Sequence, residues 1–266
     1  MLGAIIGDLA GSIYEYEQTK KHTPDIEVKN IIEEQAFFSD DTILTIAIAD
    51  AALNDKDYRE KLKEYGKKYI NFKPNFSPYF KTIFSPGFNN WIEGDYVGES
   101  GGNGAMMRIS PIGYYFDTEE KVVENARLAT TPSHNCSSAM VAAKKVALAI
   151  FYARKGYSKE EIKSKLGIKP RKVKLEKFNY TCEETIDLCF WSLFNSKSFE
   201  DAIKLAISFG GDTDTNACIV GSMAEAMYGI DEQLKHAALS KLPAEFVTVI
   251  EKFYNKISYK DQNSKI

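Results

Sequence analysis

Apolar residues recur at intervals of three and four positions along most of the chain, the spacing that gives a helix one buried face. Between residues 137 and 155, for example, Met140, Ala143 and Ile150 share one face, while Lys144 and Lys145 point away from it. Strand-like alternation is scarce. The pattern predicts an all-α fold, with helices at residues 42–53, 57–71, 119–129, 137–155, 158–166, 182–195, 199–208, 215–228, 231–239 and 243–256.

Two segments lack the helical pattern. Residues 72–100 combine prolines, glycines and many aromatic residues, so we predict a long loop or an irregular lid. Its aromatic rings either pack on the core or stack on a purine, and packing is the expected role. Residues 165–177 carry six basic residues and one acid, which indicates a solvated connector; the valine and isoleucine content of 168–175 allows a short strand.

Composition and charge narrow the picture mainly by exclusion. We expect residues 1–266 to form a single domain. The 34 basic and 37 acidic residues give a net charge of −3, which excludes nucleic-acid binding driven by bulk positive charge. No segment reaches the roughly 20 apolar residues that cross a bilayer. Four cysteines without a CxxC pair, and an N-terminus without a signal-peptide pattern, predict a reduced, cytoplasmic protein.

Two short segments share an unusual construction, in which two close aspartates and a hydroxyl residue stand before an apolar helix rich in small residues. They are SDDTILTIAIADA at residues 39–51 and GGDTDTNACIVGSMAEA at residues 210–226. Aspartate and serine are preferred helix N-caps, so each segment taken alone is consistent with capping only. However, each carries two acids where one cap suffices, and buried unpaired carboxylates are costly.

A bound divalent cation would offset the repulsion among these acids. The candidate ligands are the carboxylates and hydroxyls of Ser39, Asp40, Asp41, Asp212, Asp214 and Thr215. These hard oxygen donors suit Mg²⁺ or Mn²⁺, with Ca²⁺ as an alternative, rather than zinc or copper. An EF-hand is excluded, because Ala217 and Met223 occupy the positions of its glycine and its last glutamate. If the two segments converge, four carboxylates can hold two metals about 3.5 to 4 Å apart, a spacing that activates water.

Two glycine-containing segments predict a site for a phosphorylated sugar. Asp8 stands between two glycines with Glu15 shortly after it, and the segment GGNG at residues 101–104 precedes Arg108. Glycines permit close approach of the backbone, and exposed amides can hold phosphate or ribose oxygens. The second segment fails as a dinucleotide-binding fingerprint, because Met107 stands where the third glycine belongs. A turn without function is the alternative for GGNG.

The segment TTPSHNCSS contains a histidine and a cysteine close together. His134 is a candidate for orienting a substrate or a proton, although a lone histidine near a helix start is more often structural. Cys136 is not expected to act as a nucleophile, since nothing near it in the sequence lowers the pKa of its thiol.

Taken in order, the segments GDLAGSIYE, FSDDTILTIAIADA, GGNGAMMRISPIG, SHN and SFGGDTDTNACIVGSMAEAMYG resemble the signature segments of the ADP-ribosylglycohydrolase family. The resemblance spans about residues 3–230. It implies a compact all-α domain with a binuclear magnesium or manganese centre. It also implies cleavage of the glycosidic bond at C1″ of the distal ribose in ADP-ribosylated molecules.

Carried over position by position, the resemblance implies the same metal ligands, Ser39, Asp40, Asp41, Asp212, Asp214 and Thr215. It implies that Glu15 acts as an acid or base at the leaving group, or occupies a metal position before substrate binds. The segment that would line the distal ribose and the phosphates comprises Gly102, Asn103, Gly104 and Ala105, with His134 contacting the same region. Relatives tend to have His-Pro-Glu where this chain has Cys136, Ser137 and Ser138, which affects the expected substrate specificity more than the metal chemistry.

The resulting hypothesis is metal-dependent hydrolysis, in which Asp214 orients a water and Glu15 assists the leaving group. One alternative is a phosphohydrolase with Asp212 as nucleophile, although Asn216 stands where the DxDxT motif needs threonine. The other is a non-catalytic ADP-ribose-binding protein. Expected partners are an ADP-ribosylated protein or a small ADP-ribose conjugate, with ADP-ribose as product; no membrane is expected, and a nucleic acid is the less favoured carrier.

Overall fold

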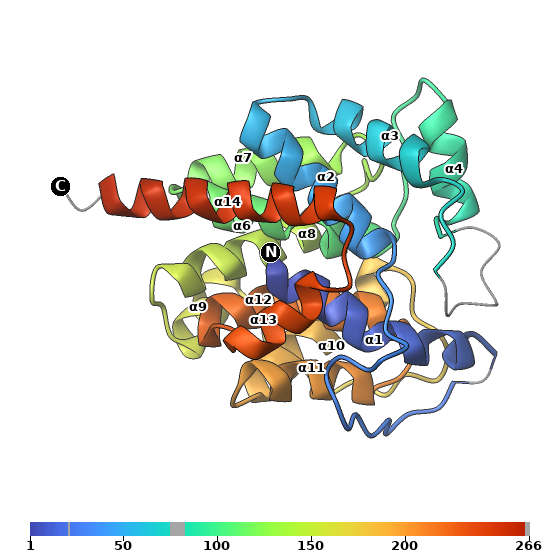
Figure 1. Ribbon diagram of the computed structural model, residues 1–266. Helices are drawn as coiled ribbons and strands as arrows, with labels where there is room; N and C mark the ends of the chain where they lie inside the picture. Colours follow the sequence, from blue (N-terminus) through green and yellow to red (C-terminus); the bar gives the residue numbers. More distant parts are fainter. Residues whose placement is uncertain (21, 75–82, 264–266) are drawn as a thin grey trace.

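The computed structural model describes residues 1–20, 22–74 and 83–263, and these residues form an all-α fold as predicted (Figure 1). They contain no β-sheet, and their extended pairing consists of the isolated bridges Glu99–His134 and Gly102–Thr181. None of the described helices is long and apolar enough to cross a membrane. The helices are α1 (Leu2–Lys20), α2 (Asp40–Asn54), α3 (Tyr58–Tyr69), α4 (Pro86–Glu93), α5 (Gly104–Met107), α6 (Ser110–Tyr115), α7 (Glu119–Thr130), α8 (Ser137–Arg154), α9 (Lys159–Leu166), α10 (Cys182–Asn195), α11 (Phe199–Ser208), α12 (Thr213–Tyr228), α13 (Glu232–Leu239) and α14 (Ala244–Asn263).

Helix α12 forms the centre of the molecule. Every residue from Thr213 to Ala224 is buried, as expected for a helix built of small and apolar residues on all sides. Helix α1, from the opposite end of the sequence, lies along α12, and α8, α10 and α11 pack against its other sides (Figure 1). The first turn of α12 is therefore held inside the protein rather than on its surface.

Helix α1 approaches α12 so closely that only glycine fits at three positions of its contact face. A Cβ atom on Gly3, Gly7 or Gly11 would lie 2.0 to 2.3 Å from a backbone oxygen of α12. These glycines are four residues apart and so lie on one face of α1. The interpretation of the N-terminal glycines as part of a phosphate-binding segment is wrong: Gly7 and Gly11 lie within a helix and serve helix–helix packing.

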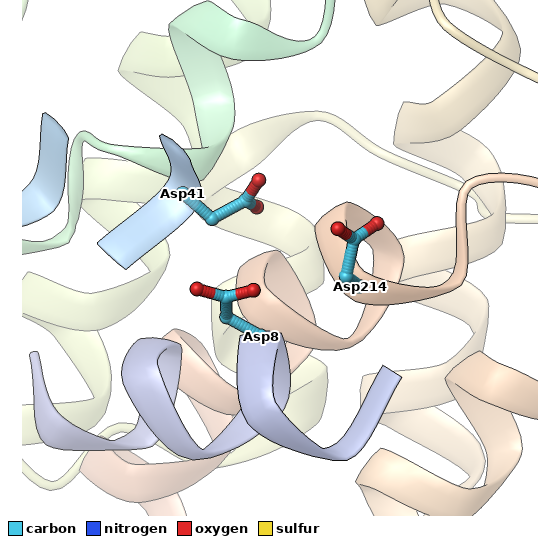
Figure 2. Close-up of side chains that lie close together, drawn as sticks. All are labelled: Asp8, Asp41 and Asp214. Carbon is cyan, nitrogen blue, oxygen red and sulfur yellow. The ribbon is translucent and has the colours of Figure 1, made fainter. Parts of the chain in front are cut away.

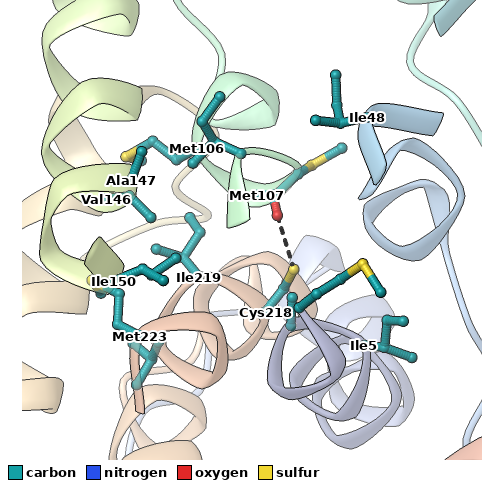
Figure 3. Packing of buried hydrophobic residues seen from close by; sticks show 14 of the residues in the cluster. Ile5, Ile48, Met106, Met107, Val146, Ala147, Ile150, Cys218, Ile219 and Met223 are labelled. Carbon is teal, nitrogen blue, oxygen red and sulfur yellow. Dashed lines mark hydrogen bonds between the residues drawn. The ribbon is translucent and has the colours of Figure 1, made fainter. Parts of the chain in front are cut away.

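Helix α5 is a single turn that directly follows the glycine segment, and it is anchored between α2 and α12. The backbone oxygen of Met107 accepts hydrogen bonds from the thiol of Cys218, at 3.3 Å, and the hydroxyl of Thr45, at 3.4 Å. Apolar residues including Met106 and Ile219 are buried around this anchor (Figure 3). The glycine segment is thus fixed relative to the starts of α2 and α12.

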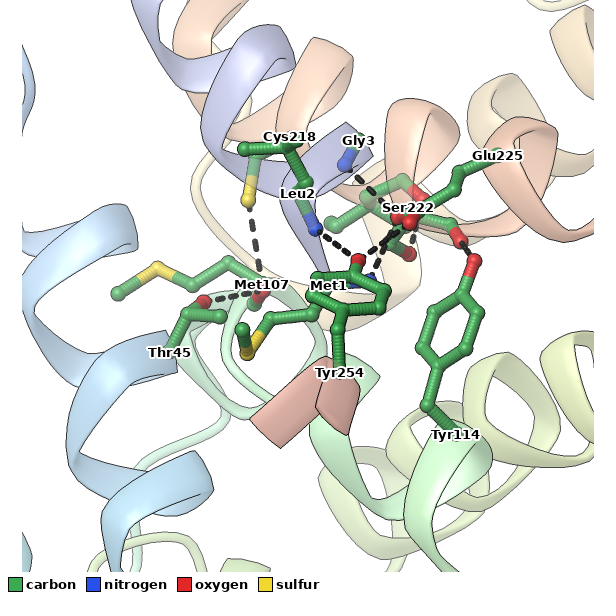
Figure 4. A network of polar contacts seen from close by, with 11 residues as sticks. Met1, Leu2, Gly3, Thr45, Met107, Tyr114, Cys218, Ser222, Glu225 and Tyr254 are labelled. Atoms are coloured by element: carbon green, nitrogen blue, oxygen red, sulfur yellow. Dashed lines mark hydrogen bonds and ion pairs between the residues drawn. The ribbon is translucent and has the colours of Figure 1, made fainter. Parts of the chain in front are cut away.

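A polar network fixes the N-terminal end of α1. The side chain of Glu225, on α12, accepts hydrogen bonds from the amino group of Met1, at 2.6 Å, and the backbone N–H of Gly3, at 2.8 Å (Figure 4). The hydroxyl of Tyr254 also donates to Glu225, which ties α14 to the same point. This network sets the position of α1 along α12.

Every predicted helix is present, with ends that differ by at most two residues except for α14, which extends to Asn263 instead of ending at residue 256. Two of these differences matter, because α2 begins at Asp40 and α12 at Thr213, two residues earlier than predicted in each case. Helix α1 and the short helices α5 and α6 were not predicted. Their sequences contain glycine or proline, which weaken the local helix propensity, whereas tertiary packing stabilises them as helices.

The aromatic segment 72–100 is not simply a loop, since it contains α4. Ser85 caps this helix by accepting a hydrogen bond from the N–H of Phe88, and Pro86 occupies its first turn. Phe84 and Trp91 are buried, and the indole N–H of Trp91 donates to the backbone oxygen of Pro132 at 2.8 Å. These two rings therefore pack on the core, whereas residues 75–82 lie outside the described residues. The alternative of a strand at 168–175 is wrong, because this stretch has no regular structure.

Candidate active site

The start of α2 carries two aspartates that are not needed as helix caps. Ser39 is the N-cap, and its hydroxyl oxygen accepts a hydrogen bond from the N–H of Asp41. The carboxylate of Asp41 is buried; its Oδ2 accepts a bond from the Ser39 hydroxyl at 3.2 Å, whereas its Oδ1 has no partner. Asp40 is partly exposed and lines the cavity described below. Capping alone thus does not account for either acid.

The start of α12 is built in a similar way. Asp212 occupies the N-cap position, but its side chain makes no capping bond. Gly210 and Gly211 precede it with φ of +71° and +73°, a left-handed conformation that favours glycine. Asp212 and Asp214 are both buried, and Oδ1 of Asp214 accepts a bond from the backbone N–H of Thr215 at 2.8 Å. This turn presents two carboxylates to the interior.

A third helix contributes an acid that the sequence analysis did not include among the metal ligands. Asp8 of α1 is fully buried, and its Oδ2 accepts hydrogen bonds from the backbone N–H groups of Ser39 and Thr42, at 2.8 and 3.1 Å. The Thr42 hydroxyl also donates to this oxygen, at 2.5 Å. Oδ1 of Asp8 has no partner. The signal available in the sequence was a single acid within the otherwise apolar first ten residues.

The carboxylates from these three helices converge (Figure 2). Oxygens of Asp8, Asp41 and Asp214 all lie within 4.8 Å of one another. A second group with the same spacing consists of Glu15, Asp212 and Asp214, so that Asp214 belongs to both. The predicted convergence of Asp41, Asp212 and Asp214 is therefore present, while Asp40 belongs to neither group.

The hydroxyls predicted to assist the acids lie beside them. The Thr215 hydroxyl donates to Oδ2 of Asp41 at 3.2 Å, the same oxygen that accepts from Ser39. Within the described residues, no lysine, arginine or histidine forms an ion pair with these carboxylates. As far as the described residues go, the site thus combines several acids with hydroxyl groups and has no direct cationic partner.

Burial and mutual repulsion raise the pKa values of the clustered acids. Burial, followed by the charge of Asp214, raises the pKa of Asp8 to about 7. The same two causes raise the pKa values of Glu15, Asp40 and Asp41 well above the usual carboxyl range. For Asp214 itself, burial and the neighbouring Asp212 have this effect.

The residues fit a divalent cation on the chemistry of the donors. All are hard oxygens, and the Oδ1 atoms of Asp8 and Asp41 are buried without a hydrogen-bond partner. Positive charge at this point would replace the missing partners and remove the repulsion that raises the carboxyl pKa values. Carboxylate and hydroxyl oxygens are the ligand types that suit Mg²⁺ or Mn²⁺.

The acids other than Asp8 line a cavity of about 810 Å³. Gly102, Asn103 and Gly104 line it, and the Asn103 amide donates to Oδ2 of Asp212 at 2.6 Å. Ala105, which we predicted beside them, is fully buried and does not line the cavity. Seven Phe, Tyr and Trp residues form part of the wall, namely Phe37, Phe84, Phe88, Trp91, Tyr96, Phe178 and Tyr180.

His134 lines the same cavity, as predicted, and is buried except for 6% of its surface. Its Nε2 faces the glycine segment, since a Cβ atom added to Gly104 would lie 3.4 Å from it. Cys136 does not line the cavity; its thiol donates to the backbone oxygen of Ser100 at 3.2 Å. Cys136 therefore supports the loop rather than forming a nucleophile with His134.

The all-α fold around an acidic cavity has a close counterpart among solved structures. A structure titled "ADP-ribosylglycohydrolase-related protein complex" superposes with a TM-score of 0.71 at 20% identity, covering 96% of this chain and 97% of that one. At this identity the likeness concerns the fold. The family model for ADP-ribosylglycohydrolase matches residues 1–263, and the chain belongs to that family.

Two curated relatives illustrate the range within the family. "ADP-ribosylarginine hydrolase Tri1" of Pseudomonas putida (strain GB-1) is 23% identical, covering 86% of this chain and 70% of its own length. "ADP-ribosylhydrolase ARH3" of Homo sapiens is 25% identical, covering 87% of this chain and 85% of its own length. The first of these names specifies the linkage that is cut and the second does not.

Proposed function

We propose that the protein is a hydrolase that depends on divalent metal ions and cleaves the glycosidic bond at C1″ of the distal ribose in an ADP-ribosylated substrate. The observation that carries this proposal is that two clusters of three acids share Asp214, which lines a large cavity. Membership of the ADP-ribosylglycohydrolase family supports the reaction class. Within the proposal, residues 1–266 act as one domain.

We assign the carboxylates to two metal ions. Asp41 and Asp214 would hold one ion, with the hydroxyls of Ser39 and Thr215 beside them, and Asp212 and Asp214 would hold the other. Asp40 reaches the cavity and is available as a further ligand. When bound, Mg²⁺ or Mn²⁺ supplies positive charge that stabilises developing negative charge and lowers the pKa of water.

Residues of the chain would carry the proton transfers. Asp214 orients the water, whose oxygen forms the new bond to C1″ and whose proton passes to Asp214, while the bond from C1″ to the acceptor breaks. Glu15 donates the proton that the departing acceptor needs; burial and the surrounding acids raise the pKa of this carboxyl well above its usual range. The proton on Asp214 is released to solvent, and Glu15 regains a proton from solvent before the next turnover. The products are ADP-ribose and the unmodified acceptor.

The cavity is large enough for an ADP-ribosyl group. A volume of about 810 Å³ is within the range of sites for cofactor-sized ligands. Gly102, Asn103, Gly104 and His134 would bind the distal ribose and the phosphates, and the aromatic wall would bind apolar parts of the ligand. The carrier is an ADP-ribosylated protein or a small ADP-ribose conjugate.

The phosphohydrolase alternative loses support at Asn216. Its side chain accepts a hydrogen bond from Asn179 at 2.9 Å, is fully buried and does not line the cavity. The segment before Asp212 is a turn that follows α11, not the strand that such a phosphohydrolase needs. A non-catalytic ADP-ribose-binding protein would not need two such clusters of acids.

A substrate panel tests the proposal. Purified protein with Mg²⁺ is incubated with ADP-ribosyl-arginine, ADP-ribosyl-serine and O-acetyl-ADP-ribose, and released ADP-ribose is measured. We expect at least one linkage to be cut by the wild type and by Asp50→Ala, but not by Asp214→Ala. Asp50 is the control, because it lies near the C-terminal end of α2, away from the site, and pairs with Lys61 at 2.9 Å. Tight ADP-ribose binding without turnover of any linkage would favour the non-catalytic alternative, and trapping of a phosphate on Asp212 would favour the phosphohydrolase.

A further inference from the structure

A buried arginine, Arg108, lines the cavity together with His134. Arg108 follows α5 and is among the largest fully buried side chains of the described residues, with 1% of its surface exposed. Its Nη2 donates to the hydroxyl oxygen of Ser133 at 2.6 Å and to the backbone oxygen of Ala129 at 3.4 Å. Because a guanidinium has donors and no acceptor, Ser133 must accept in this pair.

The same serine oxygen lies 2.8 Å from Nδ1 of His134. The Ser133 hydroxyl carries one hydrogen, and within the described residues Nδ1 is the acceptor that this hydrogen can reach. If Nδ1 carried the imidazole hydrogen instead, the buried serine hydrogen would be left without an acceptor, which is unfavourable. The chain of donors therefore runs from Arg108 to Ser133 to Nδ1 of His134.

The other ring nitrogen faces the ligand cavity. A Cβ atom added to Gly104 would lie 3.4 Å from Nε2, and one added to Gly102 would lie 3.8 Å from it. No described residue accepts a hydrogen bond from Nε2, so this nitrogen is available to a ligand that rests on the glycine segment.

We propose that Arg108 and Ser133 are positioning residues that hold His134 as a neutral imidazole with its hydrogen on Nε2, aimed at an acceptor oxygen of the ligand beside Gly102 and Gly104. The identification of that oxygen as part of a ribose or pyrophosphate rests on the proposed function. The other tautomer would present a lone pair to the same oxygen and repel it. The relay thus sets the polarity of the contact.

The electrostatics agree with a neutral ring. Burial, together with the positive charge of Arg108, lowers the pKa of His134 well below its usual range. The donor would consequently be present throughout the pH range in which exposed histidines titrate.

Nitrogen NMR of protein labelled at histidine tests the tautomer directly. The chain has three histidines, so the spectrum is simple, and the signal lost in His134→Gln identifies His134. We expect the shifts of a neutral ring with hydrogen on Nε2, unchanged between about pH 5.5 and 8. A ring with hydrogen on Nδ1, or one that titrates in this range, overturns the proposal. This readout needs no turnover, so its outcome is separate from that of the proposed function.

Variants test the relay itself. Ser133→Ala removes the donor to Nδ1 and is expected to give a mixture of tautomers and about tenfold weaker binding of ADP-ribose by calorimetry. Ser133→Thr keeps the hydroxyl and is expected to retain the tautomer. Arg108→Gln keeps a donor to Ser133 and is also expected to retain the tautomer of His134. Arg108→Met removes this donor and is expected to lose the single tautomer.

A matched control separates the relay from loss of any buried hydroxyl. Ser192 is fully buried and its hydroxyl has no hydrogen-bond partner, so Ser192→Ala should leave the tautomer and ADP-ribose binding unchanged. Unchanged tautomer and affinity in Ser133→Ala would overturn the proposal. If Ser133→Ala does not fold, the wild-type spectrum and the Arg108→Gln spectrum still decide it.

Discussion

The hydroxyl of Thr215 donates a hydrogen bond to Oδ2 of Asp41 over 3.2 Å, although 174 positions separate the two residues in the sequence. This contact joins the first turn of α12 to the first turn of α2. It leaves Oδ1 of Asp41 buried and without a partner, beside Asp8 and Asp214. This hydrogen bond and those that Asp8 accepts from the start of α2 fix the acids of α1, α2 and α12 relative to one another.

Asp214 belongs to both carboxylate groups, so its replacement should affect both. We expect Asp214→Asn to lower the rate of ADP-ribose release by at least about 100-fold. Because the substitution removes a buried charge, it should also raise the melting temperature of the chelator-treated protein and reduce the stabilisation gained on adding Mg²⁺. Asp50→Asn serves as the control; it weakens the pairing with Lys61 but should leave the rate of ADP-ribose release and the stabilisation by Mg²⁺ unchanged. A stable Asp214→Asn variant with wild-type turnover would contradict this assignment.

Asp8 fixes the loop that leads into α2, since its Oδ2 accepts from both Ser39 and Thr42. Asp8→Asn should weaken metal binding by about 10- to 100-fold, the range for groups that orient metal ligands. Titration of chelator-treated protein with Mn²⁺ measures this effect, and excess Mn²⁺ should restore part of the activity. Metal affinity equal to that of the wild type would show that Asp8 has no part in the site.

The glycines of α1 hold Asp8 in place by allowing α1 to contact α12. In Gly7→Ala the new methyl group would lie 2.0 Å from the backbone oxygen of Ala217, so the helices must separate. We expect a loss of at least about 3 kcal/mol in the free energy of unfolding, measured in urea. The control is Gly87→Ala in α4, where the added atom meets nothing within 4 Å and the expected change is within about 1 kcal/mol. Equal stabilities of the two variants would contradict the account of the α1–α12 contact.

The clustered acids predict an unusual pH dependence of stability for the metal-free protein. Burial and the charge of Asp214 raise the pKa of Asp8 to about 7 in the fold, whereas an unfolded aspartate has a pKa of about 3.9. The folded state therefore binds more protons than the unfolded state between these values, and its stability should rise as pH falls from about 8 to about 5.5. Thermal melts with a chelator at these two pH values measure the effect. Added Mg²⁺ should stabilise the protein more at the higher pH; a metal-free protein that melts at a lower temperature at the lower pH would disagree with the account.

Much of the fold could be predicted because helical periodicity is a local property. The predicted helix at 182–195 is identical to α10, and Thr181 with Glu184 forms a capping box at its start. Helix α1 could not be predicted in the same way, because Gly3, Gly7 and Gly11 favour loops when only the local sequence is considered. Their role depends on contact with α12, more than 200 positions away, and no local pattern contains that information.

The residues of the candidate site also differ in whether the local sequence predicts them. Asp41, Asp212 and Asp214 could be predicted, because two acids at one helix start exceed what capping needs. Asp8 could not, since its partners Ser39 and Thr42 come from a different helix start. The Arg108–Ser133–His134 relay was equally hidden, because a hydrogen bond from Arg108 to Ser133 spans 25 positions and leaves no periodic signal.

The dependence of hydrolysis on a divalent cation is the central claim, and one measurement tests it most directly. Wild-type protein is treated with EDTA, freed of the chelator, and assayed for release of ADP-ribose from the linkage it cuts, before and after addition of Mg²⁺ or Mn²⁺. We predict that the rate falls by at least about 100-fold on treatment and returns when the ion is added. A rate that is the same with and without the metal would contradict the account.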